Sequence, residues 1–343
     1  MESDLLPVRR ARSHATAGNI APVSIATHPV VVSLTPVFLL IGVGYLAGRL
    51  NWIREAAVGD LSNLVFLLLI PALLFRTMSG VHVEQLDLTP VAAYFAAALC
   101  LLLLSVAWRG FDRRSVVMAL AGTFSNMVMI GITLVELAYG KAALVTLLTL
   151  VSVHALILLT LGSVLLELTV AREVRSGGER APHVLATAWS AFRGALIHPI
   201  PLPILCGLLF AQTGWTLPAL VDKPLLLLGN AFGPLALVLV GVTLSRTPLL
   251  GHWRDALWIC LSKNVLLPLG VGLSAWAMGI TGLPLTVMVV AAALPIGANV
   301  FLFAQRYQTA QALTTASMGL STVLALLTLS AWMLLLSVLP LAN

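Results

Sequence analysis

The run Gly122-Thr-Phe-Ser-Asn126-Met-Val-Met-Ile-Gly131 places two glycines and several polar side chains inside an apolar stretch that extends over 114–139. A helix that crosses a bilayer must satisfy its own backbone hydrogen bonds, and glycine weakens a helix. We therefore expect a break near Asn126, with the freed backbone groups facing a cavity. A second apolar stretch, 283–306, is interrupted in the same way by Pro295-Ile-Gly-Ala-Asn299.

Long apolar runs fill the rest of the chain. A spanning helix needs about 20 mostly apolar residues, so we divide these runs at charges and turn residues. The division predicts ten transmembrane helices: 29–48, 58–78, 88–108, 114–139, 142–169, 195–213, 218–245, 253–279, 283–306 and 310–339. The two interrupted runs are the fourth and the ninth.

The composition agrees with this pattern. Of the 343 residues, 59% are hydrophobic and 9% are charged, whereas charged residues make up about a quarter of an average soluble domain. A chain with so few charges cannot coat a water-soluble surface of this size. The composition therefore excludes a soluble enzyme and predicts an all-α polytopic membrane protein.

Motifs for catalysis, metal binding and ATP hydrolysis are absent from the sequence. It contains no HExxH and no GxSxG, and none of its lysines lies in GxxxxGK[ST]. Cys100, Cys206 and Cys260 are too far apart for a CxxC pair. The basic residues are scattered, unlike the basic stripe of nucleic-acid-binding proteins. We predict no enzymatic activity, no metal or cofactor, and no nucleic-acid partner.

One extended polar stretch separates two sets of five helices. The predicted units are a tail at 1–28, a first five-helix repeat at 29–170, a cytoplasmic loop at 171–194 and a second repeat at 195–343. If the halves are homologous, an odd number of helices in each half inverts the second relative to the first. The sequence therefore predicts two inverted five-helix repeats with interrupted helices 4 and 9.

The basic residues predict the orientation in the membrane. Odd-numbered loops carry twelve of them: Arg49, Arg54, Arg109, Arg113, Arg114, Arg172, Arg175, Arg180, Arg193, Arg246, Arg254 and Arg306. Even-numbered loops carry three, namely Arg76, Lys141 and Lys223. Since cytoplasmic loops are enriched in Lys and Arg, the odd loops are predicted to be cytoplasmic and both termini external. The tail residues Arg9, Arg10 and Arg12 oppose this orientation.

Three segments together resemble the auxin efflux carrier family, which includes plant auxin exporters and bacterial malate or malonate permeases. They are Leu61-Ser-Asn63-Leu-Val-Phe-Leu-Leu-Leu-Ile-Pro71-Ala-Leu-Leu-Phe75, the run 122–131, and Pro295-Ile-Gly-Ala-Asn299-Val-Phe. The resemblance implies ten helices, external termini, and a scaffold of helices 1, 2, 6 and 7. It also implies that helices 4 and 9 cross within a mobile unit.

Two departures from the family pattern affect the expected site. Members of the family continue the first crossing motif with Gly-x-Pro, whereas this chain has Gly131-Ile-Thr133. Many members begin helix 6 with Asn-Pro, whereas this chain has His198-Pro199. The substrate and the coupling ion of this chain can therefore differ from those of other family members.

The interruptions supply the groups that a carboxylate site needs. The amides of Asn126 and Asn299 donate hydrogen bonds without placing a fixed charge in lipid, and broken helix ends attract anions. Eight residues are candidates for substrate binding: Asn63, Ser125, Asn126, Gly131, Thr133, Pro295, Gly297 and Asn299. The alternatives are interhelical hydrogen bonds for the polar residues and packing kinks for the glycines and Pro295.

Three further residues are candidates for coupling or counter-charge. Lys263 is a lysine inside a predicted spanning helix, at a cost of roughly 2.5–3.5 kcal/mol if central, unless it snorkels to the surface. His154 and His198 could couple transport to protons, because histidine titrates near physiological pH. The alternative for both is an ordinary hydrogen-bonding role. We expect Glu136 to be an interfacial acid rather than a proton carrier.

These features predict a secondary active transporter of the inner membrane. The expected substrate is an organic anion such as malonate, malate or an auxin-like acid, moved by alternating access of the elevator type. Its expected partners are this substrate, membrane lipid, a coupling ion that is either H⁺ or Na⁺, and a second copy in a homodimer. A channel, or a receptor of the same fold, is the alternative.

Overall fold

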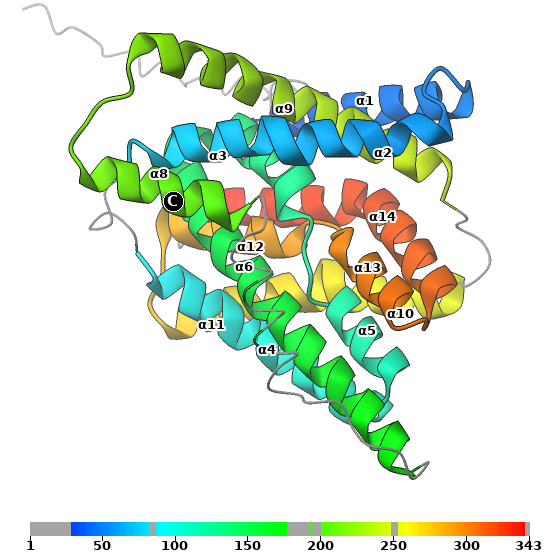
Figure 1. Ribbon diagram of the computed structural model, residues 1–343. Coiled ribbons are helices and arrows are strands. Elements are labelled where there is room, and N and C mark those ends of the chain that lie inside the picture. Colours follow the sequence, from blue (N-terminus) through cyan, green and yellow to red (C-terminus); the bar gives the residue numbers. More distant parts are fainter. Residues whose placement is uncertain are drawn as a thin grey trace, which may run out of the picture.

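The computed structural model describes residues 29–81, 87–176, 189, 193, 200–247 and 253–339, and these residues are almost entirely helical (Figure 1). The predicted tail, His198 and most of the central loop lie outside the described residues. Described helices lie in all ten predicted ranges. They are α1 (Pro29–Arg49), α2 (Glu55–Leu64), η2 (Val65–Leu69), α3 (Ile70–Met78), α4 (Thr89–Arg109), α5 (Arg113–Ala121), η4 (Met127–Gly131), α6 (Ile132–Ser176), α8 (Pro201–Gln212), α9 (Ala219–Ser245), α10 (Trp253–Leu261), η5 (Ser262–Leu266), α11 (Leu267–Ala277), α12 (Gly282–Ala293), α13 (Asn299–Arg306) and α14 (Gln311–Val338).

Several of these helices have membrane-spanning dimensions. Within the described residues, six stretches are long and apolar enough to cross a membrane, and Leu34–Arg49, Pro201–Gln212 and Gly282–Ala293 are shorter apolar helices. The longest stretch is divided at Gly140, whose φ of 76° and ψ of −173° interrupt α6. This kink coincides with the predicted boundary between the fourth and fifth helices. The number of crossings and the inverted repeat stay predictions.

The helices form two bundles. In the first, α1 packs along α9, and α3 packs against α8 and α9. In the second, α4 packs on α11, α10 on α14, and α12 on both α11 and α14. Figure 1 shows α1, α2, α3 and α9 as a layer above α4, α5, α10 and α14. The long helix α6 contacts both bundles and so links them.

Glycines let α1 and α9 approach closely in the first bundle. A Cβ on Gly44 would collide with the backbone of Val238, and one on Gly241 would collide with the backbone of Ile41. Small residues at such crossings allow van der Waals contact between backbones, which replaces the hydrophobic driving force that lipid removes. The α1–α9 pair is therefore built as a tight, fixed contact.

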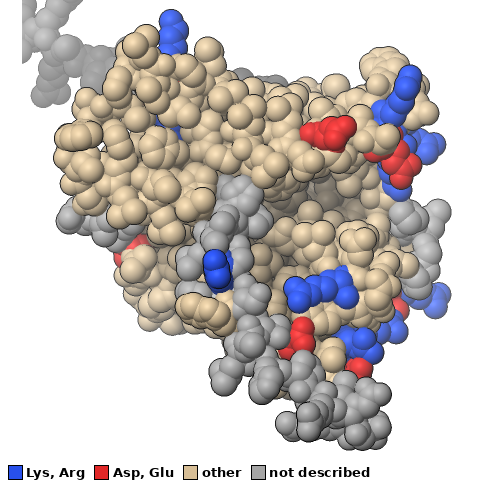
Figure 2. All heavy atoms as spheres, in the orientation of Figure 1, with Lys and Arg blue, Asp and Glu red and all other residues tan. Residues whose placement is uncertain are grey.

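The short helices α5 and α12 lie deepest in the second bundle. Every residue from Ser115 to Ala121 is buried, and so is every residue from Leu285 to Ala293. Figure 2 shows a mostly uncharged face, with most of its acidic and basic groups in the right half of the view. The two interrupted segments are therefore held in the interior of the second bundle.

Candidate functional site

The two interrupted segments cross and pair with each other. Helix α5 ends at Ala121 and the chain turns helical again at η4, while α12 ends at Ala293 and α13 begins at Asn299. The backbone N–H of Asn126 donates to the carbonyl of Pro295 at 2.8 Å, and the N–H of Gly297 donates to the carbonyl of Phe124 at 2.9 Å. These bonds flank an isolated antiparallel bridge between Ser125 and Ile296. Each broken helix thus satisfies freed backbone groups of the other.

Three of the predicted residues make this crossing possible. Pro295 has no N–H to leave unpaired, and its carbonyl accepts the bond from Asn126. A Cβ on Gly297 would lie 2.8 Å from the ring of Phe124, and one on Gly131 would lie 2.6 Å from the side chain of Leu294. Both glycines therefore allow close packing at the crossing, Gly297 against a ring and backbone and Gly131 against the flexible end of a leucine. The first segment breaks without the proline that the family pattern has there.

The two asparagines lie at the start of the helix that follows each break. Asn126 precedes η4, and its side-chain oxygen accepts a hydrogen bond from the N–H of Met129 at 3.3 Å. Asn299 is the first residue of α13 and is half-buried. Among the described residues the side-chain NH₂ groups of both asparagines have no hydrogen-bond partner. Two helix N-termini with free amide donors therefore lie on either side of the bridge.

The hydroxyl groups of Ser125 and Thr133 face different surroundings. Buried Ser125 contacts the hydroxyl of Tyr94 in α4 at 3.2 Å. Thr133 packs against Gly233 of α9, in the other bundle. Its buried Oγ1 has no hydrogen-bond partner among the described residues. Ser125 is thus turned into the second bundle, whereas Thr133 lies between the two bundles.

Lys263 lies in the π-helical turn η5 and is fully buried, so it does not snorkel to the surface. Its Nζ donates to the carbonyl oxygen of Ala292 at 2.5 Å and to that of Leu294 at 2.6 Å. These carbonyls are left unpaired where α12 ends, and a positive charge is favourable at the C-terminus of a helix. The lysine therefore caps the break in the second crossing segment.

A neutral hydrogen-bond network supports the same segment. The backbone N–H of Ile296 donates to Ser321 Oγ at 3.2 Å, and Ser321 Oγ donates to Asn264 Oδ1 at 2.7 Å. Asn264 Nδ2 donates back to the carbonyl of Ser321 at 3.1 Å, and Trp332 Nε1 donates to the carbonyl of Asn264 at 3.0 Å. Sequence reasoning missed this support, although a polar Asn264 beside Lys263 in a spanning helix is itself a signal of a functional position.

His154 lies beside the first crossing segment. It is buried, and its ring lies 4.6 Å from that of Phe124 and 5.7 Å from that of Tyr94, measured between centroids. Neither ring nitrogen has a hydrogen-bond partner among the described residues. The ordinary hydrogen-bonding role expected as the alternative is therefore not seen among these residues.

The remaining candidates lie away from the crossing or outside the described residues. Asn63 is exposed on α2, before the π-helical turn η2 of the first bundle. His198 is not among the described residues. Within the described part of the chain, no group of three or more His, Cys, Asp or Glu residues is placed to hold a metal ion.

A cavity lies next to the first crossing segment, between the two bundles. Its volume is about 300 Å³, and its lining includes Pro36 of α1, Thr133 and Glu136 of α6, and Asn230 and Gly233 of α9. Thr133 thus borders an open space. Glu136 also lines this space and is exposed, and its role as an interfacial acid stays a prediction.

Comparison with known proteins agrees with these features. The family model described as "Membrane transport protein" matches residues 29–333. A Rhizobium meliloti (strain 1021) protein named "Putative malonate transporter" is 29% identical over 303 residues, covering 86% of this chain and 92% of that protein. An Arabidopsis thaliana protein named "Auxin efflux carrier component 8" is 24% identical over 330 residues, covering 81% and 89%. The chain therefore belongs to the membrane transport protein family, the auxin efflux carrier family that its crossing motifs resemble.

Proposed function

We propose that this membrane protein is a secondary active transporter that carries a small organic anion across the inner membrane. Malonate, malate and auxin-like acids are the substrates to test, and the name of the Rhizobium meliloti relative puts malonate first. In this proposal ten helices form two inverted repeats, and both termini lie outside the cytoplasm. The observation that carries the proposal is the backbone pairing of the two broken helices at Asn126 and Gly297.

The chemistry of the crossing suits a carboxylate. The second helix of each broken pair begins at the crossing, and a helix N-terminus carries a partial positive charge and free N–H groups. The amide groups of Asn126 and Asn299 add neutral donors at the same two points. A carboxylate accepts such bonds from both sides, whereas a cation would meet donors alone.

The packing suits alternating access. The π-helical turn η4 belongs to the first crossing segment and contacts α9 of the first bundle. Thr133 and the cavity of about 300 Å³ lie along the same contact. If the second bundle slides along α9, the crossing moves with it past a fixed wall. This geometry supports an elevator motion in which a single site is exposed to each side in turn.

Lys263 and His154 receive different roles in this proposal. Lys263 holds the end of α12 in place and adds a positive charge close to the crossing. His154 makes H⁺ the coupling ion to test first, because histidine in water titrates near physiological pH and the unpartnered imidazole lies beside the first crossing segment. His198 keeps the same predicted role without structural support.

Uptake by the purified protein in liposomes tests the proposal. We expect labelled malonate or another short carboxylate to accumulate when a pH gradient is imposed, and to saturate with concentration. A Na⁺ gradient of equal size should have little effect. Unsaturable uptake with single-channel currents would instead identify a channel, and no uptake of any tested acid would leave a receptor as the better interpretation.

A further inference from the structure

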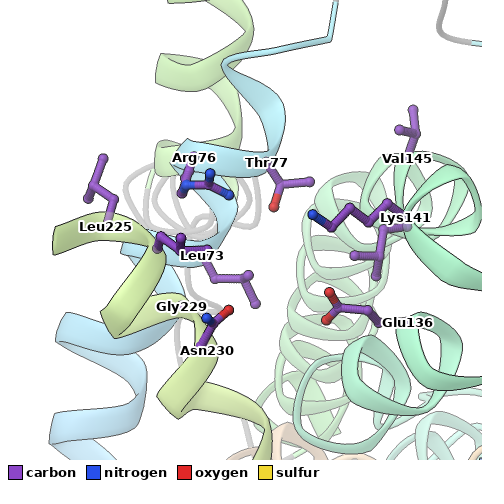
Figure 3. Close-up of a pocket in the computed structure, with 11 residues that line it drawn as sticks. Leu73, Arg76, Thr77, Glu136, Lys141, Val145, Leu225, Gly229 and Asn230 are labelled. Carbon is purple, nitrogen blue, oxygen red and sulfur yellow. The ribbon is translucent and has the colours of Figure 1, made fainter. Parts of the chain in front are cut away.

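A second cavity, here called the outer cavity, lies beside the one at Thr133. It is closer to the C-terminal end of α3 and to the N-terminal part of α9. Its volume is about 250 Å³, and residues of α3, α6 and α9 line it (Figure 3). Arg76 lies in the last turn of α3, and Lys141 directly follows the kink at Gly140. Two of the three basic residues in the loops predicted to be external therefore line one small space.

The two cations are held differently. Arg76 makes two contacts with Asp222 in the first turn of α9, Nε to Oδ1 at 2.7 Å and Nη2 to Oδ2 at 3.1 Å. This ion pair, with one hydrogen bond from Nη2, holds the guanidinium at the cavity wall. Lys141 is exposed, and no carboxylate of the described residues lies within 4.0 Å of its ammonium group. Figure 3 shows that the Lys141 side chain points toward Thr77, across the space from α6 to α3.

The opposite part of the cavity carries different groups. Figure 3 shows the Glu136 carboxylate pointing toward the amide of Asn230. Both residues also line the cavity of about 300 Å³ that contains Thr133. Glu136 and Asn230 therefore lie where the two cavities meet, between the cationic part of the outer cavity and the crossing.

We propose that this outer cavity is a second anion site, in which Lys141, Arg76 and Thr77 bind the carboxylate of a short-chain aliphatic acid. The inference rests on the proposed carrier function and deepens it by naming the substrate class. Leu73, Leu144 and Leu225 supply an apolar wall for the carbon chain. The volume of about 250 Å³ lies below the roughly 300–1,000 Å³ of drug-sized pockets, which favours a small acid, and the residues that line the cavity are aliphatic or polar rather than aromatic.

The charge of Glu136 provides a separate test of anion binding in this site. Its carboxylate repels an anion in the same cavity, whereas Lys141 attracts it, and the two side chains come from the same helix. Removing either charge should change anion affinity in opposite directions. A residue that acted through folding alone would not produce such a pair of effects.

Binding to the purified full-length protein tests the proposal. Affinities for acetate, lactate, malonate and malate are measured by calorimetry in Lys141→Gln, Glu136→Gln and the matched control Lys223→Gln, an exposed lysine of α9 outside the cavity lining. We expect Lys141→Gln to weaken binding about tenfold, the loss of one charge-assisted contact. We expect Glu136→Gln to tighten binding about two- to fivefold at low salt. Lys223→Gln should bind like the wild type.

The other outcomes overturn the inference. These are equal losses in Lys141→Gln and Lys223→Gln, no change in Lys141→Gln, weaker binding in Glu136→Gln, or no binding of any of these acids to the wild type. If indole-3-acetate alone binds with a Lys141-dependent affinity, the aliphatic class is wrong. Failure of the carrier proposal is a different result, namely normal Lys141-dependent binding without transport in liposomes.

Discussion

The two crossing segments share one antiparallel bridge but have different support. In the second segment, Lys263 caps the end of α12 and Ser321 holds the N–H of Ile296. In the first, Tyr94 contacts Ser125 at 3.2 Å, and the side-chain hydrogen bonds of Thr123 and Asn126 stay within the segment and the end of α5. The neighbouring His154 has no hydrogen-bond partner among the described residues. The second segment is thus fixed by a charge and a network, whereas the first leaves polar groups free for a ligand or a proton.

Of the substitutions at the crossing, the one that removes the charge of Lys263 should destabilise the protein most. In Lys263→Met, the carbonyls of Ala292 and Leu294 lose their donor in a buried place, and each unsatisfied group costs about 1–3 kcal/mol. We expect a loss of about 2–5 kcal/mol in the free energy of unfolding and no transport, measured by thermal melts in detergent and by liposome uptake. Lys223→Met is the control, and equal melting of Lys263→Met and wild type would disprove the capping role.

The neutral network should matter less. Ser321→Ala leaves the N–H of Ile296 and the oxygen of Asn264 without their partner, which we expect to destabilise the protein by about 1–3 kcal/mol. Asn264→Ala should add little to Ser321→Ala, because residues in one network are not additive. Thermal melts of the two single variants and the double variant measure this. Full additivity would show that the two residues act separately.

Of the two glycines of the crossing, the one in the second segment should also be the more important for stability. In Gly297→Ala the new Cβ meets the ring of Phe124 and the carbonyl oxygen of Ser125 at 3.1 Å, which is backbone and cannot move aside. In Gly131→Ala it meets the flexible end of the Leu294 side chain. We expect about 1–3 kcal/mol of destabilisation for Gly297→Ala and less for Gly131→Ala. If Gly131→Ala melted at a lower temperature than Gly297→Ala, the close contact of Gly297 with the backbone of Ser125 would be contradicted.

The contact in the first segment should matter least. Tyr94→Phe removes a weak hydrogen bond to Ser125 and keeps the ring, so we expect a loss of about 0.5–1.5 kcal/mol. Comparison with the stability loss measured for Lys263→Met shows how much more the second segment depends on its side-chain contact than the first. If Tyr94→Phe destabilised as much as Lys263→Met, the comparison on which this account rests would fail.

Much of the fold follows from local sequence patterns. The ten apolar ranges contain helices, and both interruptions lie where glycine, proline and asparagine gather in 122–131 and 295–299. Gly140 separates two helices at the predicted boundary between the ranges 114–139 and 142–169. Such features depend on neighbours in the chain, so a single sequence is enough to predict them.

The contacts that build the site depend on distant residues and were not predictable in this way. The bond from Asn126 to Pro295 joins positions far apart in the chain, and its register depends on the packing of whole helices. Lys263 is a candidate for counter-charge or coupling from its place in an apolar run, but the carbonyls that hold its ammonium group belong to Ala292 and Leu294, at the end of another helix. Arg76 and Lys141 were noted as markers of topology, and the fold brings both to one cavity.

Exchange of malonate across the membrane of loaded liposomes tests the central claim most directly. The account predicts that wild type and the control Gln212→Ala, an exposed amide at the end of α8, exchange external labelled malonate for internal malonate at similar rates. Asn126→Ala and Asn299→Ala should each be slower by about tenfold or more, since a hydrogen bond to a charged group contributes about 1.5–3 kcal/mol. Unchanged exchange in both asparagine variants, with the protein folded, would contradict a substrate site at the helix crossing.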